Sequence, residues 1–377
     1  MDFDLSDEQQ MLAEATRDLL ARSDDPEGRA RAVAGELGWS RAVWKCLAAM
    51  GLLGLTFAEE DGGMDAGPVE AMVVMTEIGR RLAPEPLVDA VLLPGGLVAA
   101  VGTAHQRRGI LPDLAAGEAL LAFAHHEPGR RWPDTTVATA ATRSGTGWTV
   151  TGTKHPVLHG DCAQRLIVSA ALPDGGIGLF VVGADAEGVA RTGYRTHDHR
   201  RGAQIELSAA PAEPLGEPID RSAEIEAAEV RTQALLCAEA VGAMDEALRL
   251  TVEYLKTRKQ FGVPLARFQA LTHRAADMYV ALELARSMSL YLTMSLAAGT
   301  ADAIVASRAR LRVARSARLI GQQAIQMHGG IGLTVEYPVG HYANRLTAIE
   351  HTLGGRDDHL RRLSGRVRDH RMVVIQP

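Results

Sequence analysis

Apolar and polar positions alternate with the period of a helix in the first third of the chain. Between residues 6 and 23 the apolar side chains fall at three- and four-residue intervals, on one face of a helix: Met11, Leu12, Ala15, Leu19 and Leu20. Ser6, followed by Gln9, is typical of a capping box at a helix start. Residues 41–55 and 69–83 repeat the pattern. We therefore expect a helical domain over residues 1–118.

Short β-like runs replace this pattern between residues 119 and 215. They are rich in Val, Thr and Ile, and Gly, Pro and Asp separate them: 119–126, 136–143, 147–154, 165–172, 176–183 and 203–210. Runs of this length bounded by turn residues predict strands. We expect a middle β domain over residues 119–215, built as a barrel or a sandwich.

Helical periodicity returns from residue 222 to the end of the chain. A first helix carries Leu248, Val252 and Leu255, a second carries apolar residues from Phe268 to Ala285, and a third covers 302–327. Long consecutive helices of this kind predict a four-helix bundle over residues 222–377. The expected fold class is thus α+β, with a helical domain, a β domain and a helical bundle in that order.

Residues 347–360, "TAIEHTLGGRDDHL", predict a helix that stops and then resumes. Gly354 and Gly355 form the break, since each glycine within a helix costs about 1 kcal/mol relative to alanine. Leu353 stands at the edge of this break. The pattern raises the question of what occupies the gap.

Composition narrows the class of protein. The net charge is −6 with both signs mixed along the chain, which gives no reason to expect nucleic-acid binding. Three widely spaced cysteines indicate a reduced, cytoplasmic protein and fit no metal pattern. The N-terminus is acidic and lacks the features of a signal peptide. Pro94 and two glycines break the longest apolar stretch, so we expect no membrane span.

Residues 254–269, "YLKTRKQFGVPLARFQ", predict a helix end, a turn and a new helix that starts near Ala266. Arg258 and Lys259 would lie in the last turn, where cations favour a helix C-terminus. They are either solvated charges at a helix end or part of an anion-binding site. Arg258 suits such a site because a guanidinium binds a pyrophosphate through two hydrogen bonds. Phe261 and Phe268 would form an apolar wall beside that site.

Residues 326–338, "QMHGGIGLTVEYP", predict a helix that stops at Gly329 and Gly330. Adjacent glycines allow a ligand to approach the backbone closely. Gln326 and His328 would then be polar groups near that contact. The alternative is an ordinary glycine helix stop with a packed histidine.

At their spacing of about sixty residues, these two segments together resemble the C-terminal domain of the acyl-CoA dehydrogenases. "HHEPG" at 125–129 and "GWTVTGTKHPVLHG" at 147–160 resemble segments of that family's β domain that face the flavin. The resemblance covers essentially the whole chain. It is strongest for the bacterial small-subunit type, such as that of pimeloyl-CoA dehydrogenase, on "EAVGAMDEALRLTVEYLKTRKQFGVP" and "VGHYANRLTAIEHTLGG".

The resemblance implies an FAD-dependent enzyme of lipid and fatty acid metabolism that removes two hydrogens from an acyl-CoA. In this family a carboxylate takes the Cα proton, the flavin accepts the Cβ hydride, and FAD lies between two subunits. The residues implied to meet the neighbour's FAD are Arg258, Gln260, Phe261, Phe268, Gln269, Gln326, Met327, Gly329 and Gly330. His125, His126 and Leu158 would lie on the segments that face the flavin of the same subunit.

The same-subunit half of the implied site departs from the family pattern. Leu353 stands where the family places its glutamate base, with Gly354 and Gly355 after it. Some members carry the base on the first bundle helix, where this chain has Thr232. The family's aromatic and threonine beside the flavin ring become Pro156 and Leu158, and its serine-containing loop becomes Arg130, Arg131 and Trp132.

We therefore hypothesise an accessory subunit that completes the FAD site of a paralogous catalytic subunit in a heterotetramer. Glu350, Glu239, His125 and His126 are the other candidate bases. As a buried base Glu239 would have a raised pKa. The alternative roles are an ion pair on the helix face for Glu239 and packing at the β edge for the two histidines. The alternatives are a self-sufficient homodimer or homotetramer with a relocated base, a non-catalytic acyl-CoA-binding scaffold, and flavin-dependent oxygen chemistry. Electron-transfer flavoprotein is the implied acceptor. Small residues at Ala238, Ala240, Gly242 and Ala243 would either leave room for a bulky or long acyl chain or serve close helix packing.

Overall fold

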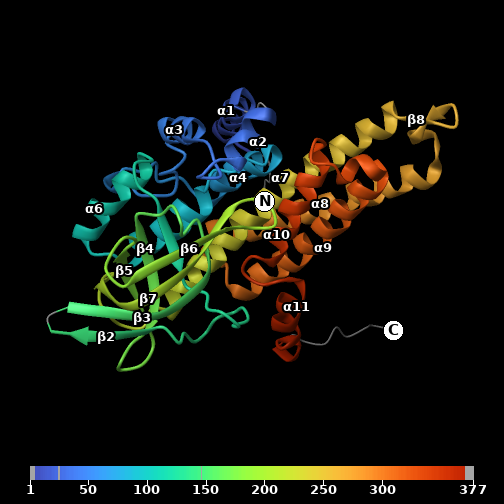
Figure 1. The fold of residues 1–377 in the computed structure, drawn as a ribbon. Helices are drawn as coiled ribbons and strands as arrows, with labels where there is room; N and C mark the ends of the chain where they lie inside the picture. Colours follow the sequence, from blue (N-terminus) through green and yellow to red (C-terminus); the bar gives the residue numbers. More distant parts are fainter. Residues whose placement is uncertain (1–4, 24–25, 146, 370–377) are drawn as a thin grey trace.

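The protein is described by a computed structural model that covers residues 5–23, 26–145 and 147–369. Helices, a sheet and further helices follow one another along the chain and lie as three adjoining regions (Figure 1). This order confirms the α+β architecture expected from the sequence. Within the described ranges, no helix combines the length and the apolar character that a membrane span requires.

The N-terminal region is helical, as predicted. Its first helix begins at the expected capping box, since Gln9 N donates to Ser6 Oγ at 3.2 Å and Ser6 N donates to Gln9 Oε1 at 3.0 Å. Leu47, Val74 and Leu97 are fully buried in the core of this region. The helices are α1 (Asp7–Ser23), α2 (Pro26–Ala34), α3 (Arg41–Ala49), α4 (Pro68–Arg81), a π-turn (Val88–Leu92), α5 (Leu93–Val101) and α6 (Ala104–Ala115).

The middle region is one seven-stranded mixed sheet. Its strands are β1 (Leu121–Ala124), β2 (Ala140–Ser144), β3 (Gly147–Leu158), β4 (Arg165–Ala171), β5 (Ile177–Gly183), β6 (Val189–Arg195) and β7 (Arg201–Pro214). The strands follow the order β1-β4-β2-β3-β7-β5, β6 pairs with β7, and β5 also pairs with β4. The pairings run from β4 through β2, β3, β7 and β5 back to β4. β6 is a strand that the prediction missed.

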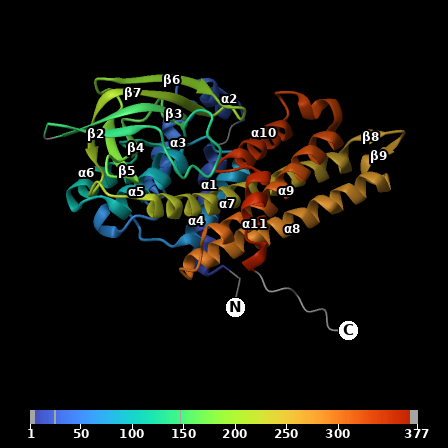
Figure 2. The same ribbon diagram turned by 90° about the horizontal axis from the view of Figure 1, so that it is seen from below.

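The C-terminal region consists of long helices that run beside one another (Figure 2). They are α7 (Ser222–Thr257), α8 (Gln269–Ala297), α9 (Ala303–His328), α10 (Pro338–His351) and α11 (Arg356–Ser364). Between α7 and α8 lies a hairpin of β8 (Lys259–Gln260) and β9 (Val263–Pro264). Arg258 and Lys259 therefore follow the helix instead of lying in its last turn, and the new helix begins at Gln269, after a 3₁₀ turn at Leu265–Arg267.

Two glycines bring α4 and α7 into backbone contact. A Cβ atom on Gly79 would lie 1.9 Å from the Glu239 carbonyl oxygen, and one on Gly242 would lie 1.9 Å from that of Thr76. Only residues without a side chain allow this crossing. Ala238, Ala240 and Ala243 of the same helix are fully buried in the packing. The small residues at 238–243 thus serve helix packing. They line no cavity that could hold an acyl chain within the described residues, so they do not provide the room for an acyl chain expected from them.

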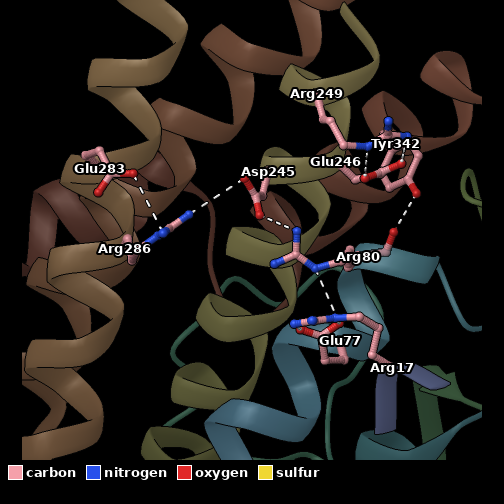
Figure 3. Close-up of polar contacts among 9 residues, drawn as sticks. All are labelled: Arg17, Glu77, Arg80, Asp245, Glu246, Arg249, Glu283, Arg286 and Tyr342. Atoms are coloured by element: carbon pink, nitrogen blue, oxygen red, sulfur yellow. Dashed lines mark hydrogen bonds and ion pairs between the residues drawn. The ribbon is translucent and has the colours of Figure 1, made fainter. Parts of the chain in front are cut away.

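A polar network joins the N-terminal helices to the bundle at this crossing (Figure 3). Arg80 of α4 pairs with Asp245 of α7, and the Tyr342 hydroxyl of α10 donates to the Arg80 carbonyl at 2.6 Å. Arg17 of α1 pairs with Glu77 of α4 at 2.9 Å. Four helices from two regions are therefore held in one arrangement beside the glycine contact.

Candidate functional site

The helix break predicted from the sequence is present between α10 and α11. Leu353 and Gly354 both adopt left-handed backbone conformations, with φ of +54° and +90°. A Cβ atom on Gly354 would lie 2.3 Å from Cε3 of Trp132, so the indole lies directly against the glycine. Gly354 is required here by both its φ angle and its packing. The gap is thus occupied by an indole of the same chain.

Arg310 of α9 holds the end of α10 from the opposite side. The side chain is fully buried, and its Nη2 donates to the carbonyl oxygens of Ile349 at 2.6 Å and Thr352 at 2.7 Å. The helix ends there, so these carbonyls lack the i+4 partners of a continuing helix, and within the described ranges the Ile349 carbonyl keeps only a backbone bond from Thr352 N at 3.2 Å. The position of the break is therefore fixed by a buried guanidinium.

Trp132 also contacts a buried carboxylate that the sequence did not single out. Its Nε1 donates to Glu229 Oε2 at 3.0 Å. Glu229 lies on α7 one turn before Thr232 and is 6% exposed. Burial raises the pKa of Glu229, an effect that His126 and the indole hydrogen bond only partly oppose. A single sequence gives no signal for this residue, because its role depends on which way the helix faces.

These residues border a cavity of about 630 Å³ between the sheet, α7 and α10. Its apolar wall comprises Leu93, Phe123, Trp132, Pro156, Leu158 and Leu353. Its polar wall includes Asp89, His126, His159, Asp198, Arg200, Glu229 and Arg345. The cavity therefore gathers side chains from all three regions of the chain.

Apart from Arg131 and Gly355, which do not line it, the predicted same-subunit residues meet in this cavity with one exception. His126, Pro156, Leu158, Thr232 and Leu353 all line it. His126 Nδ1 lies 2.7 Å from a carboxylate oxygen of Asp134. The exception is His125, which is buried away from the cavity with Nδ1 2.9 Å from Ser169 Oγ, and burial lowers the pKa of His125 to about 3.

Neither glutamate proposed as a substitute base reaches the cavity. Glu239 is fully buried and accepts two hydrogen bonds from Arg345, at 2.8 and 2.7 Å, and one from Arg200 at 2.8 Å. Burial by itself raises the pKa of Glu239, but Arg345 and then Arg200 outweigh it, so the net shift is downward. The expected rise in pKa is therefore wrong. Glu350 is buried on α10, where its charge acts on Arg310.

The predicted neighbour-facing residues lie elsewhere, near the ends of the long helices. The β8–β9 hairpin stands at the tip of the bundle, far from the sheet in both views (Figures 1 and 2). Phe261 at its turn is 92% exposed, and its ring meets that of Phe268 edge-on with centroids 6.1 Å apart. Arg258, Gln260 and Gln269 are also exposed.

The end of α9 lies against the end of α7 near this hairpin. The ring of His328 stacks on Tyr254 with centroids 4.5 Å apart, and His328 Nδ1 lies 2.7 Å from the Ala324 carbonyl oxygen. Gln326 is exposed, whereas Met327 is buried. Gly329 and Gly330 end the helix as predicted, and a Cβ atom on either would meet no atom within 4 Å. The backbone is therefore open to a ligand from outside the chain.

Known proteins share this architecture over nearly the full length. "Acyl-CoA dehydrogenase IpdE2" of Mycobacterium tuberculosis is 30% identical, with 96% of this chain and 98% of that protein covered. A chain of the Tcur3481–Tcur3483 steroid ACAD is 31% identical with a TM-score of 0.87, covering 96% of this chain and 98% of that one. A chain of the ChsE4-ChsE5 complex of M. tuberculosis is 26% identical with a TM-score of 0.90, covering 99% and 100%.

Family-level matches agree with these likenesses. Residues 6–118 match the acyl-CoA dehydrogenase N-terminal domain, and residues 230–367 match the acyl-CoA dehydrogenase C-terminal domain. Helices, a mixed sheet and long helices, with a cavity where the three meet, define the acyl-CoA dehydrogenase fold. The chain belongs to the acyl-CoA dehydrogenase family, whose members are FAD-dependent oxidoreductases.

Proposed function

We propose that this chain is an accessory subunit of a hetero-oligomeric acyl-CoA dehydrogenase. It completes the FAD site of a paralogous catalytic subunit and has no proton-abstracting base at the family's position in its own site. The observation that carries the proposal is the helix break at Leu353. An aliphatic side chain stands there, and Trp132 covers the neighbouring Gly354.

The cavity of this chain fits a flavin ring poorly. Pro156 has no backbone N–H to donate, and the Leu158 side chain has no hydrogen-bonding group, at positions where the family has an aromatic and a threonine. Trp132 also fills space at the mouth of the break. The cavity of this chain therefore carries out no step of the reaction in this proposal.

The bundle tip fits the other half of a shared FAD site. Arg258 is exposed and makes no side-chain hydrogen bond or ion pair within the described ranges, so its guanidinium is free to take a pyrophosphate. Phe261 and Phe268 supply an apolar surface, and Gly329 and Gly330 offer open backbone. When bound, FAD would supply the hydride acceptor at the partner's active centre. The role of this chain is to bind and orient it.

Relatives support a two-component assembly. One solved neighbour is a complex of two differently named chains, ChsE4 and ChsE5. By analogy, this chain would join a glutamate-bearing paralogue, with an acyl-CoA bound at the partner's centre and electrons passed to electron-transfer flavoprotein. A cytoplasmic location and a role in lipid and fatty acid metabolism belong to the same proposal.

Flavin counting tests the proposal. The chain is expressed alone and together with a glutamate-bearing paralogue, and FAD is quantified per subunit by absorbance after denaturation. We expect a colourless isolated chain, and a complex that carries FAD and reduces it when acyl-CoA is added. Stoichiometric FAD and robust turnover in the isolated chain would refute the accessory role.

Glu229 favours a second candidate function, a self-sufficient enzyme with a relocated base. It is a buried carboxylate on α7 that faces the cavity, and its raised pKa makes it a stronger base. If the isolated chain binds FAD and oxidises acyl-CoA, Glu229→Gln should lower kcat about a hundredfold or more. An unchanged rate would exclude this candidate.

A further inference from the structure

The wall of the cavity contains a buried histidine whose ring lacks hydrogen-bond partners within the described ranges. His159 directly follows strand β3 and is 1% exposed, yet neither of its ring nitrogens has a partner there. Its backbone is left-handed, with φ of +53°, a conformation that costs a non-glycine residue free energy. Buried polar atoms without hydrogen-bond partners destabilise the folded state. Such a residue at a cavity wall indicates a ligand.

His159 is neutral in this position. Burial, followed by the charges of Arg200 and Arg345, lowers the pKa of His159 to about 3. A neutral imidazole presents one N–H donor and one nitrogen acceptor. The two nitrogens point in different directions, so a small ligand group would accept from the N–H or donate to the bare nitrogen of His159.

Asp89 lines the same cavity as His159. Its carboxyl group makes no hydrogen bond within the described part of the chain, and the charges of Arg200 and Arg345 act on it as they act on His159. Burial raises the pKa of Asp89, and Arg200 and Arg345 only partly oppose this. Both arginines are already paired with Asp198 and Glu239, so they are not free to hold an anion.

Part of the remaining wall is apolar, whereas His126, Glu229 and other polar side chains line the rest of it. Leu93 lies one helical turn after Asp89, and Pro156 and Leu158 precede His159 on β3. A cavity of about 630 Å³ is within the range that small-molecule sites occupy, roughly 300–1,000 Å³. The ligand therefore combines an apolar body of moderate size with one small polar group.

We propose that this cavity binds an apolar molecule that carries a hydroxyl group, with the hydroxyl directed at His159 and Asp89. A hydroxyl can accept from the N–H of the neutral imidazole and donate to the Asp89 carboxyl at the same time. The Asp89 carboxyl would repel an anionic group, and Arg200 and Arg345 would repel a cationic group. A ligand of this kind goes beyond the proposed function, because it would occupy the cavity, which fits a flavin ring poorly.

Matched pairs of acids test the proposal on the full-length purified chain. Lithocholate and 5β-cholanate are rigid and differ by one hydroxyl, and 12-hydroxydodecanoate and dodecanoate are a flexible counterpart. Isothermal titration should show about tenfold tighter binding of the hydroxylated member in at least one pair. Equal affinities within both pairs, or no binding of any of the four, would overturn the proposal.

Two variants separate a ligand-binding role from a structural one. His159→Phe should abolish the preference and leave the ligand-free melting temperature equal or higher, because it removes two unmet polar atoms. A structural histidine would instead lower the melting temperature when replaced. Asp89→Leu should also abolish the preference. A preference that survives both substitutions would overturn the proposal, whatever flavin counting shows for the accessory role.

Discussion

At the scale of single residues, Gly354 combines two requirements that only glycine meets. Its φ of +90° is unfavourable for other residues, and an added Cβ would lie 2.3 Å from the Trp132 ring. The neighbouring Leu353 accepts a left-handed conformation without being glycine, at φ +54°. This local strain is held by the buried Arg310 and by the indole.

Replacing Gly354 with alanine should therefore destabilise the protein. We expect a loss of roughly 2–4 kcal/mol from backbone strain and overpacking together. Gly355→Ala is the matched control, because Gly355 has φ of −83° and an added Cβ would come no closer than 3.5 Å to other atoms. The control should cost less than about 1 kcal/mol. Urea unfolding measures the free energy of unfolding of both variants. Equal losses would contradict the close contact between Gly354 and the Trp132 ring.

Glu229 predicts a pH-dependent stability. Burial raises the pKa of Glu229 above the ordinary value of 4.5, so the folded protein holds its proton more tightly than the unfolded chain. Stability from this group is present below about pH 4.5 and is lost as pH rises through the folded-state pKa. Glu229→Gln removes the titration, and its glutamine oxygen can still accept from the Trp132 indole.

The stability gained by Glu229→Gln should therefore increase with pH above 4.5 and then level off. Chemical unfolding at several pH values between 4.5 and 8 measures the difference from the unmodified protein. Glu118→Gln, at an exposed glutamate, serves as the control and should show no such trend. A difference that stays constant with pH would show that Glu229 is ionised throughout.

At the scale of elements, the crossing of α4 and α7 depends on Gly242. An added Cβ would lie 1.9 Å from the Thr76 carbonyl oxygen, and backbone cannot move aside as a side chain can. Gly242→Ala should destabilise by about 1–3 kcal/mol or more and separate the helices. Gly96→Ala in α5 is the control, since its Cβ would meet no atom within 4 Å, and it should stabilise by about 0.5–1 kcal/mol. Calorimetric melting distinguishes them, and a tolerated Gly242→Ala would contradict the close crossing.

Periodicity predicted elements well where local chemistry alone determines them. The capping box at Ser6, the stop at Gly329 and the break at Gly354 depend on neighbouring residues, and the structure has all three. Strand β6 was missed because its side chains are mostly exposed and lack a run of apolar residues. Periodicity also could not show that Gly242 serves packing, since the same small residue would suit either a channel or a close helix contact.

The candidate site was less predictable than the fold. The neighbour-facing residues and Leu353 were found from a family pattern, because that pattern is continuous in sequence. Glu229, His159 and Asp89 lie on three different elements, and only the fold brings them to one cavity. The sign of the Glu239 pKa shift depended on Arg345, which is more than one hundred residues away in the chain.

At the scale of the whole molecule, the two halves of the proposed cofactor site lie apart. The cavity lies between the three regions. The exposed hairpin stands at the far tip of the bundle (Figures 1 and 2). A single copy would therefore not bring both halves to one FAD molecule. In the proposed assembly the hairpin of one subunit would lie against the cavity of another, and losses in one half need not affect the other.

Arg258→Ala should consequently reduce FAD binding in the complex with the catalytic partner without affecting the isolated chain. Arg258 is exposed and has no side-chain partner within the described ranges, so its removal should leave the melting temperature of the chain unchanged. The loss of a guanidinium–pyrophosphate contact should weaken FAD binding by about tenfold or more. Lys256→Ala removes an exposed cation just inside the same helix end and should leave FAD affinity within about twofold. The proposed pyrophosphate contact requires the bidentate guanidinium of Arg258 and not merely positive charge nearby. Fluorescence titration of the flavin-stripped complex measures both affinities. Equal effects of the two substitutions would mean that the bundle tip contributes a general electrostatic field, and no effect of either would place the FAD pyrophosphate away from this chain.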